Sequence, residues 1–387
     1  MELSAIGEMI QIARDSAPVL TWPGYDIREI PFAIYDDNQV CYIGHPNPPD
    51  TRPANLMAAT SVDINGIATA TIPATMCLDT ESALPLAYHE GFHVFQQRHF
   101  VPLDADMFLA MAFYPDLDVD YRALCRLEIE TLRRVDWSAE QQLRFLGHIA
   151  SLRRSKLTRH DSLLGYERFL ERSEGTAYYV EQKARQALFG VAPILDDVGH
   201  GWIRFYVVGA AICRLLEKMI PDWTTRIENG ESPGDLVIER GDSSVDLELL
   251  DYRAAWSHEA EKLRQFRDQI NGDLTKFEQP DVMRIRYQGA GQIFRAFNPS
   301  TLVSLGDGRI LHRSFFKLLL PGRGTIAVDN APVMDNVLDG EVLLTAIPIQ
   351  LREGRMRANT AEVRVEVMGV KKLSEGTYAL TDFDPIC

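Results

Sequence analysis

The residues His89-Glu90-Gly91-Phe92-His93 carry the clearest chemical pattern in the sequence. On a helix, positions four apart lie on one face, so the imidazoles of His89 and His93 can reach one metal ion. Zinc accepts neutral imidazole nitrogen and keeps a position open for water, and Glu90 is placed to take a proton when that water attacks a carbonyl group. The pattern predicts a zinc site in which His89 and His93 are ligands and Glu90 is the general base.

The alternative is that this short pattern falls by chance on a surface helix. Its neighbours argue against that alternative, because apolar residues surround the pattern on nearly every side of the expected helix. They are Leu84, Leu86, Ala87, Phe92, Val94 and Phe95. A helix of this kind is expected to be buried, and buried histidines and carboxylates need partners. A shared metal ion supplies that partner.

A catalytic zinc site needs a third protein ligand, and Glu174 is the preferred candidate. The small residues at 175–177 follow it directly, and we expect them to let this segment approach the helix of the two histidines closely. Glu171 and Glu181 compete with Glu174 as ligands because they lie on the same helical segment. A surface ion pair with a neighbouring basic residue is the other interpretation of Glu174.

Two further segments resemble a known family. Residues 174–181 read EGTAYYVE, and residues 206–217 read YVVGAAICRLLE. Together with the histidine motif, these segments resemble the aminopeptidase N family within the gluzincin zinc peptidases, over about residues 89–217. The resemblance implies a zincin-like fold and implies that the Tyr206 hydroxyl stabilises the oxyanion of the tetrahedral intermediate. The alternative for Tyr206 is a core aromatic on an apolar helix.

The sequence departs from the family pattern in three places. His93 and Glu174 are 81 positions apart (93 to 174), a longer interval than in the family, and Val208 stands where the family has lysine. The family's Gly-x-Met-Glu-Asn motif, which holds a free substrate amine, is absent, and residues 66–72 read GIATATI in its expected place. The resemblance therefore implies zinc-dependent hydrolysis more strongly than aminopeptidase specificity. The strand at 66–72 is expected to be able to pair with an extended peptide.

Hydrophobic periodicity predicts which elements position these residues. A helix at 4–14 and hairpins at 30–43 and 62–72 come first, the second hairpin turning at Asn65-Gly66. Helices are expected at about 82–97 (capped by Ser82, with Pro85 in its first turn), 119–134, 138–155 (with a Ser138–Gln141 capping box), 162–188, 201–219 and 248–272. Short strands are expected at 282–287, 301–305, 309–312, 315–320, 325–328 and 361–367.

These elements predict an α+β protein with two domains. Residues 1–280 are expected to form a zincin-like catalytic domain that is mostly helical after an N-terminal β region. Residues 281–387 are expected to form a β-rich domain, either a sandwich or barrel-like, that carries no catalytic residue. An exposed linker is expected at about 279–281.

Composition excludes several other classes of protein. The formal net charge is -15 and the lysines and arginines are not clustered, which argues against nucleic-acid binding. The five cysteines form no CxxC pair, so neither a disulfide framework nor a cysteine-rich zinc site is expected. No secretory signal and no apolar run near the roughly 20 residues of a membrane span are present, so we expect a cytoplasmic protein without a membrane partner.

The sequence thus predicts a Zn²⁺-dependent metallopeptidase acting on a peptide or protein substrate. Its predicted metal ligands are His89, His93 and Glu174, and its predicted catalytic residues are Glu90 and Tyr206. Two alternatives stay open. One is a binding or scaffold protein with a structural or relict zinc site, and the other is a zinc hydrolase of a non-peptide amide or ester.

Overall fold

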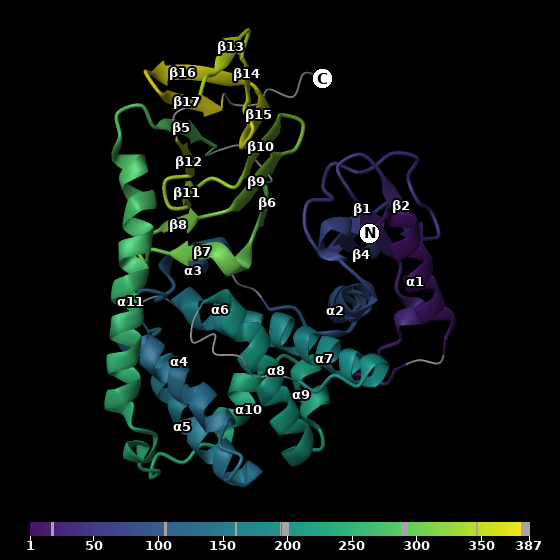
Figure 1. Cartoon of the computed structure of the whole chain (residues 1–387), viewed down its shortest axis with the longest axis vertical. Helices are drawn as coiled ribbons and strands as arrows, with labels where there is room; N and C mark the ends of the chain where they lie inside the picture. Colours follow the sequence, from purple (N-terminus) through teal and green to yellow (C-terminus); the bar gives the residue numbers. More distant parts are fainter. Residues whose placement is uncertain are drawn as a thin grey trace.

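The computed structural model of the chain describes residues 1–16, 19–103, 107–158, 161–193, 195, 201–287, 293–345 and 347–380. A helix and a small sheet come first along the chain, a large helical region follows, and a region of β-sheets comes last (Figure 1). The predicted α+β class is confirmed.

The N-terminal region is one helix and a four-stranded sheet of order β2-β1-β4-β3. Its elements are α1 (Leu3–Asp15), β1 (Phe32–Tyr35), β2 (Val40–Ile43), β3 (Thr60–Ile64) and β4 (Ile67–Pro73). Both predicted hairpins are present, as β1–β2 and β3–β4. Asn65 and Gly66 have φ angles of 51° and 80°, which a two-residue Asn-Gly turn requires.

The strand at 66–72 does not offer a free edge, contrary to the sequence-based prediction. β4 pairs with β3 on one side and, in parallel, with β1 on the other. The outer strand of the sheet on this side is β3, which lies next to the helix of the two histidines; the Ser61 hydroxyl donates to Gln97 Oε1 at 2.8 Å. The unpaired sheet edge next to α2 therefore belongs to β3.

The helical region follows the predicted order. It contains α2 (Thr80–His99), α3 (Met107–Phe113), α4 (Val119–Leu132), α5 (Ala139–Ser155), α6 (Asp161–Leu170), α7 (Thr176–Phe189), α8 (Trp202–Met219), α9 (Trp223–Glu228), α10 (Pro233–Glu239) and α11 (Tyr252–Leu274). The short helices α3, α9 and α10 were not predicted. The predicted helix 162–188 is α6 and α7 joined by a π-helical turn, Glu171–Gly175, which we call the π-turn. No helix in the described ranges is both long and apolar enough to span a bilayer.

The start of α2 differs from its prediction. Asp79, and not Ser82, is the capping residue: Asp79 Oδ1 accepts from the backbone N–H of Ser82, and the Ser82 hydroxyl lies 3.0 Å from the Asp79 backbone nitrogen. Ser82 is thus the second member of a capping box. Pro85 consequently lies inside the helix and not in its first turn.

Two sheets form the C-terminal region. One has six strands in the order β13-β14-β15-β10-β9-β6, and the other has seven in the order β16-β17-β5-β12-β11-β8-β7. The strands are β5 (Met283–Arg286), β6 (Phe294–Phe297), β7 (Leu302–Ser304), β8 (Arg309–His312), β9 (Phe315–Leu320), β10 (Gly324–Asp329), β11 (Val333–Asn336), β12 (Glu341–Leu344), β13 (Gln350–Arg352), β14 (Arg355–Asn359), β15 (Val363–Met368), β16 (Val370–Ser374) and β17 (Thr377–Leu380). Buried residues of both sheets form one apolar cluster, which is the arrangement of a sandwich. The barrel alternative is wrong, since the described strands form no closed barrel.

Apolar clusters cross the predicted boundary at residue 280. Ile270 and Phe277 at the end of the helical region pack with Val303 and Leu311 of the seven-stranded sheet. A second cluster joins helix α3 to Ile310 of β8. The sheet region therefore shares buried surface with the helices, although the chain between them is exposed at 278–281.

Limited proteolysis is expected to cut the chain at 278–281 and to leave the two fragments associated. The exposed backbone there is accessible to a protease, whereas the clusters on either side stay buried. Denaturing gels and native size-exclusion chromatography of the nicked protein check this prediction. Fragments that elute separately would show that the shared clusters do not hold the two regions together.

His312 makes the stability of the C-terminal region sensitive to acid. Its ring is 2% exposed, lies against Phe316 at 4.7 Å, and has no hydrogen-bond partner for either nitrogen among the described residues. Burial, together with the nearby Arg295 charge, lowers the pKa of His312 to about 3. The unfolded chain binds this proton below pH ~6.5, so stability is lost as the pH falls from about 6.5 toward 3.

Replacing His312 by leucine is expected to remove this loss. Between pH 7 and pH 5 the free energy of unfolding of the wild type should fall by about 2 kcal/mol more than that of His312→Leu. Urea unfolding of both proteins at the two pH values measures the difference. Equal pH dependence in the two proteins would show that His312 is not held neutral in the folded state.

Candidate metal centre

Helix α2 presents His89 and His93 from one face, as predicted. Gly91 between them is a poor helix residue, and its neighbours show why it stands there. A Cβ atom at Gly91 would lie 2.6 Å from the hydroxyl of Tyr25, which donates a hydrogen bond to the Tyr88 carbonyl at 3.0 Å. Tyr25 thus packs directly on the helix backbone at the motif.

The π-turn brings Glu174 to the two histidines. Gln96 of α2 connects the two elements, because its Nε2 lies 2.9 Å from the Ser173 carbonyl oxygen and 2.8 Å from the Thr176 hydroxyl. Its Oε1 lies 2.8 Å from His93 Nδ1. Since the amide nitrogen faces the π-turn, the amide oxygen accepts from His93 Nδ1–H, and the Nε2 lone pair of His93 is left free.

The three predicted ligands meet at one point. Glu174 Oε2 lies 3.6 Å from His89 Nε2 and 3.6 Å from His93 Nε2. All three ligand atoms lie within 4.8 Å of one another, and Glu174 Oε2 has no hydrogen-bond partner among the described residues. The group His89, His93 and Glu174 could therefore hold one metal ion.

The two competing glutamates have other partners. Glu181 Oε2 lies 3.0 Å from His89 Nδ1, on the far side of that ring from Glu174. The contact is an ion pair that lacks hydrogen-bond alignment. A negative charge in this position favours a proton on Nδ1, which leaves Nε2 to face a metal. Glu171 instead accepts from Arg153 and Arg154. Glu181 follows Glu174 by seven residues, or two helical turns. This spacing was the sequence signal that could have placed Glu181 beside His89.

Glu90 is buried beside the three ligands. It is 4% exposed, and its Oε2 has no hydrogen-bond partner among the described residues. Burial raises the pKa of Glu90 to about 8, with His89 acting in the opposite direction and Glu174 adding to the rise. A carboxylate with a pKa near 8 binds a proton about as tightly as a general base near neutral pH requires. A bound dication would favour its ionised form.

Tyr206 of α8 lies at the same centre. Its ring stacks on that of His89, with centroids 5.7 Å apart and planes 10° apart, and its hydroxyl lies near the Glu174 carboxylate. Burial, and then the charge of Glu174, raise the pKa of Tyr206 well above its usual value. The phenol therefore stays protonated at neutral pH and can donate a hydrogen bond.

A glycine contact sets the distance between the π-turn and α8. The small residues after Glu174 were expected to face α2, but Gly175 faces Gly209 of α8 instead; a Cβ at Gly209 would lie 2.7 Å from the Gly175 Cα. Thr176 is the small residue that contacts α2, through Gln96. The close approach of the two glycines brings Glu174 and Tyr206 together.

Gly209→Ala is expected to destabilise the protein by about 1–3 kcal/mol, because the added methyl forces two backbones apart. Gly272→Ala in α11 is the matched control, since a Cβ there meets nothing within 4 Å. It should instead stabilise the protein by up to about 1 kcal/mol, the helix propensity of alanine over glycine. Thermal unfolding measures both changes. Equal effects of the two substitutions would mean that the helices do not need this glycine contact.

The chain was compared with protein-family models, with curated proteins and with solved structures, and no match was found in any of the three. The resemblance to the aminopeptidase N family therefore stands on the three short motifs alone. Any function has to be argued from the geometry of the centre itself.

Proposed function

We propose that this protein is a zinc-dependent hydrolase of the gluzincin type that cleaves peptide bonds. The observation that carries the proposal is that Glu174 Oε2 lies 3.6 Å from both His89 Nε2 and His93 Nε2, with all three ligand atoms within 4.8 Å of one another. Zinc bonds of about 2.0–2.1 Å in tetrahedral geometry place ligand atoms about 3.3 Å apart, so a small closing movement fits the group to zinc. Gln96 orients the His93 imidazole by a hydrogen bond, and the Glu181 carboxylate lies 3.0 Å from Nδ1 of His89, on the side away from the predicted metal.

The chemistry divides among the residues of the centre. A zinc ion held by the three ligands would supply a Lewis acid that makes water more acidic and a carbonyl more electrophilic. Glu90 accepts the proton from the attacking water and delivers it to the leaving amine. Tyr206 donates a hydrogen bond to the oxygen that becomes negative, since burial keeps its phenol protonated.

The shape of the surroundings supports a peptide substrate. β3 is one of the two outer strands of the N-terminal sheet, and a hydrogen bond from Ser61 joins it to α2. An extended peptide that adds to this edge runs alongside the helix of His89 and His93, with its backbone groups paired. A closed structural zinc site has four protein ligands, whereas three ligand residues form the group in the described part of the chain, which favours catalysis over the scaffold alternative.

Turnover of a peptide library tests the proposal. The purified protein is expected to cleave peptides, to lose activity with a zinc chelator, and to regain it when zinc is restored. Cleavage of small esters or acyl amides without cleavage of any peptide would favour the non-peptide alternative. A zinc-loaded protein that hydrolyses neither class would favour the scaffold alternative.

A further inference from the structure

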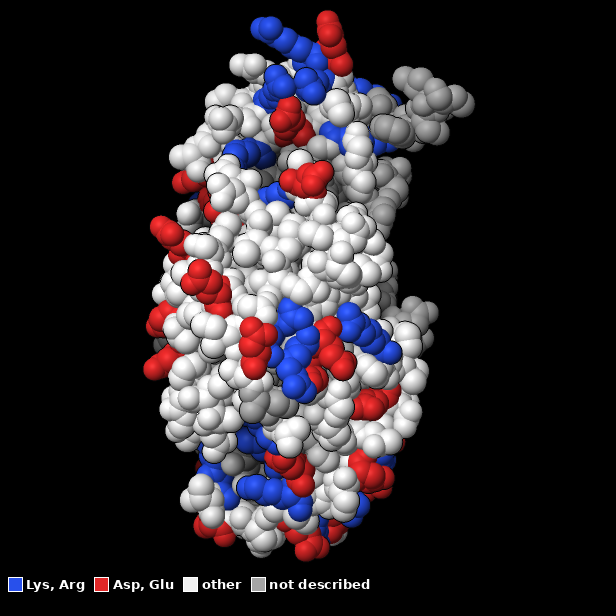
Figure 2. All heavy atoms as spheres, turned by 90° about the vertical axis from the view of Figure 1, so that its right-hand side faces the viewer, with Lys and Arg blue, Asp and Glu red and all other residues white. Residues whose placement is uncertain are grey.

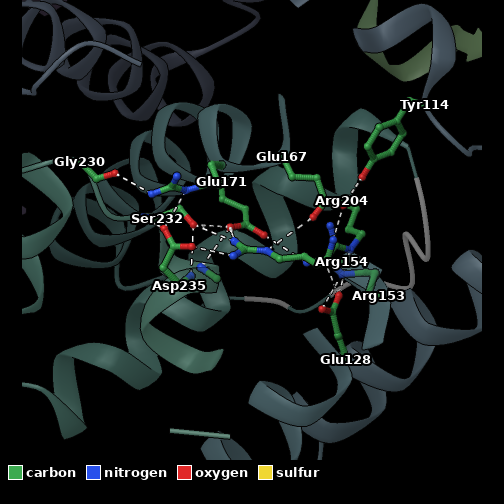
Figure 3. A network of polar contacts seen from close by, with 12 residues as sticks. Tyr114, Glu128, Arg153, Arg154, Glu167, Glu171, Arg204, Gly230, Ser232 and Asp235 are labelled. Carbon is green, nitrogen blue, oxygen red and sulfur yellow. Dashed lines mark hydrogen bonds and ion pairs between the residues drawn. The ribbon is translucent and has the colours of Figure 1, made fainter. Parts of the chain in front are cut away.

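A buried network of charged residues lies behind the metal centre. It joins three arginines to three glutamates from five different elements, namely Arg153 and Arg154 of α5, Arg204 of α8, Glu128 of α4, Glu167 of α6 and Glu171 of the π-turn (Figure 3). Five of the six are at most 5% exposed, and Arg154 is 11% exposed. Within this buried set the three positive and three negative charges balance. Arg154 also pairs with the partly exposed Asp235 at 2.6 Å.

Glu171 is the member of this network that belongs to the π-turn. Its carboxylate accepts from Arg153 Nη2 at 3.2 Å, Arg154 Nη2 at 2.9 Å, the Ser232 hydroxyl at 2.8 Å and the Gly234 backbone N–H at 3.1 Å. Burial opposes ionisation, but Arg154 and Arg153 hold the pKa of Glu171 at about 2. A carboxylate with four donors, two from α5 and two from the start of α10, has a fixed position.

Glu171 is the first residue and Glu174 the fourth residue of the same five-residue turn. In a regular α-helix, residues three apart project from the same face. The π-turn carries an extra residue, and within it Glu171 reaches the arginines while Glu174 reaches His89 and His93. Such single-turn π insertions are frequent at functional sites.

The network also reaches the helix of Tyr206. Arg153 Nε donates to Glu128 Oε1 at 2.8 Å, and Glu128 Oε2 accepts from Arg204, two residues before Tyr206 on α8. One set of buried charges thus makes ion pairs with both the π-turn and α8. These are the two elements that hold Glu174 and Tyr206 against each other.

We infer that Glu171 is a positioning residue for Glu174, and that the buried arginine network holds the π-turn in the conformation that presents Glu174 to the two histidines. The inference rests on the proposed function, since it assumes that Glu174 is a metal ligand. Neither Glu171 nor the arginines touch the metal centre themselves, so their effect on it passes through the backbone of the π-turn.

Glu171→Gln tests this inference, and Glu259→Gln is its matched control. Glu259 is also fully buried and also pairs with an arginine, Arg122 at 3.1 Å, but it joins α11 to α4 and has no contact with the π-turn. Both substitutions remove one buried negative charge from an arginine. General destabilisation should therefore be similar, and thermal unfolding of the metal-free proteins verifies that both fold.

The readout is the metal centre and not activity. In the protein reconstituted with Co²⁺, the visible absorption bands report the geometry of the ligands, and competition with a chelator gives the zinc dissociation constant. Glu171→Gln is expected to shift the bands and to weaken zinc binding by about tenfold, while Glu259→Gln changes neither. Arg154→Lys keeps the positive charge but loses the planar guanidinium, so it should shift the absorption bands and the zinc dissociation constant in the same direction by less. This variant replaces Glu171→Gln in the test if Glu171→Gln does not fold.

Wild-type spectra and zinc affinity in Glu171→Gln, or equal changes in Glu259→Gln, would overturn the inference and leave the proposed function intact. A wild-type protein that binds neither Co²⁺ nor Zn²⁺ would instead contradict the proposed function, and the inference with it.

Discussion

Glu90→Gln is expected to lower the rate of peptide hydrolysis by about 10²- to 10⁴-fold and to leave the zinc content unchanged. Glutamine has the size and shape of glutamate, so the buried position stays filled. It cannot accept a proton, and Glu90 is the carboxylate next to the ligands that has no other partner for Oε2 among the described residues. The loss corresponds to about 3–5 kcal/mol of activation free energy.

The measurement is kcat/KM on a cleaved peptide, together with zinc analysis of the same samples. Glu81→Gln is the control, because Glu81 lies on α2 too but is exposed in its first turn. It should leave both quantities unchanged. Full turnover in Glu90→Gln would show that another group takes the proton, and loss of zinc in that variant would show that Glu90 is a ligand.

Replacing both His89 and His93 by alanine is expected to reduce the zinc content to background. The two imidazoles supply two of the three ligands in the group, and Glu174 alone cannot hold the ion. The variant also removes the partner of Glu181, so circular dichroism should verify that the fold is kept.

His99→Ala provides the matched control for this pair. His99 stands at the end of the same helix, is exposed, and stacks on Phe95 at 4.2 Å. Its replacement should leave the zinc content at the wild-type value. Zinc that persists in the double variant, or that is lost in His99→Ala, would place the metal elsewhere.

Charges of both signs are mixed on one face of the molecule. Figure 2 shows acidic and basic side chains interspersed over the face that it presents, without a large field of one sign. The face drawn there presents no large charged field that would attract a substrate from a distance.

The local part of the metal centre could be predicted from the sequence because its geometry is local. His89 and His93 are one helical turn apart, and the spacing alone places them on one face. The hairpin at Asn65-Gly66 is local in the same sense. The distant ligand was harder, because Glu171, Glu174 and Glu181 share one segment and helical periodicity alone cannot say which of them faces the histidines.

The different partners of these three glutamates depend on structural features that a short sequence pattern does not contain. The π-turn changes the direction of the residues that follow it, and the arginines that hold Glu171 come from a helix about twenty positions earlier in the chain. The direction of Gly175 was mispredicted for a related reason. A small residue permits a close approach, but only the packing of α8 decides which helix approaches.

The pairing of β4 was mispredicted because sheet order is set by contacts between distant strands. Thr, Ala and Ile suit an edge strand and an interior strand equally, and β1 lies more than thirty positions before β4 in the chain. Only the tertiary arrangement places β3 at the free edge.

Elemental analysis of the wild-type protein, purified without added metal, tests the central claim most directly. The geometry of His89, His93 and Glu174 predicts about one zinc per chain, removable by a chelator and restored by added Zn²⁺. A protein that contains no zinc and takes up none when zinc is supplied would contradict the proposal that this centre is a zinc site.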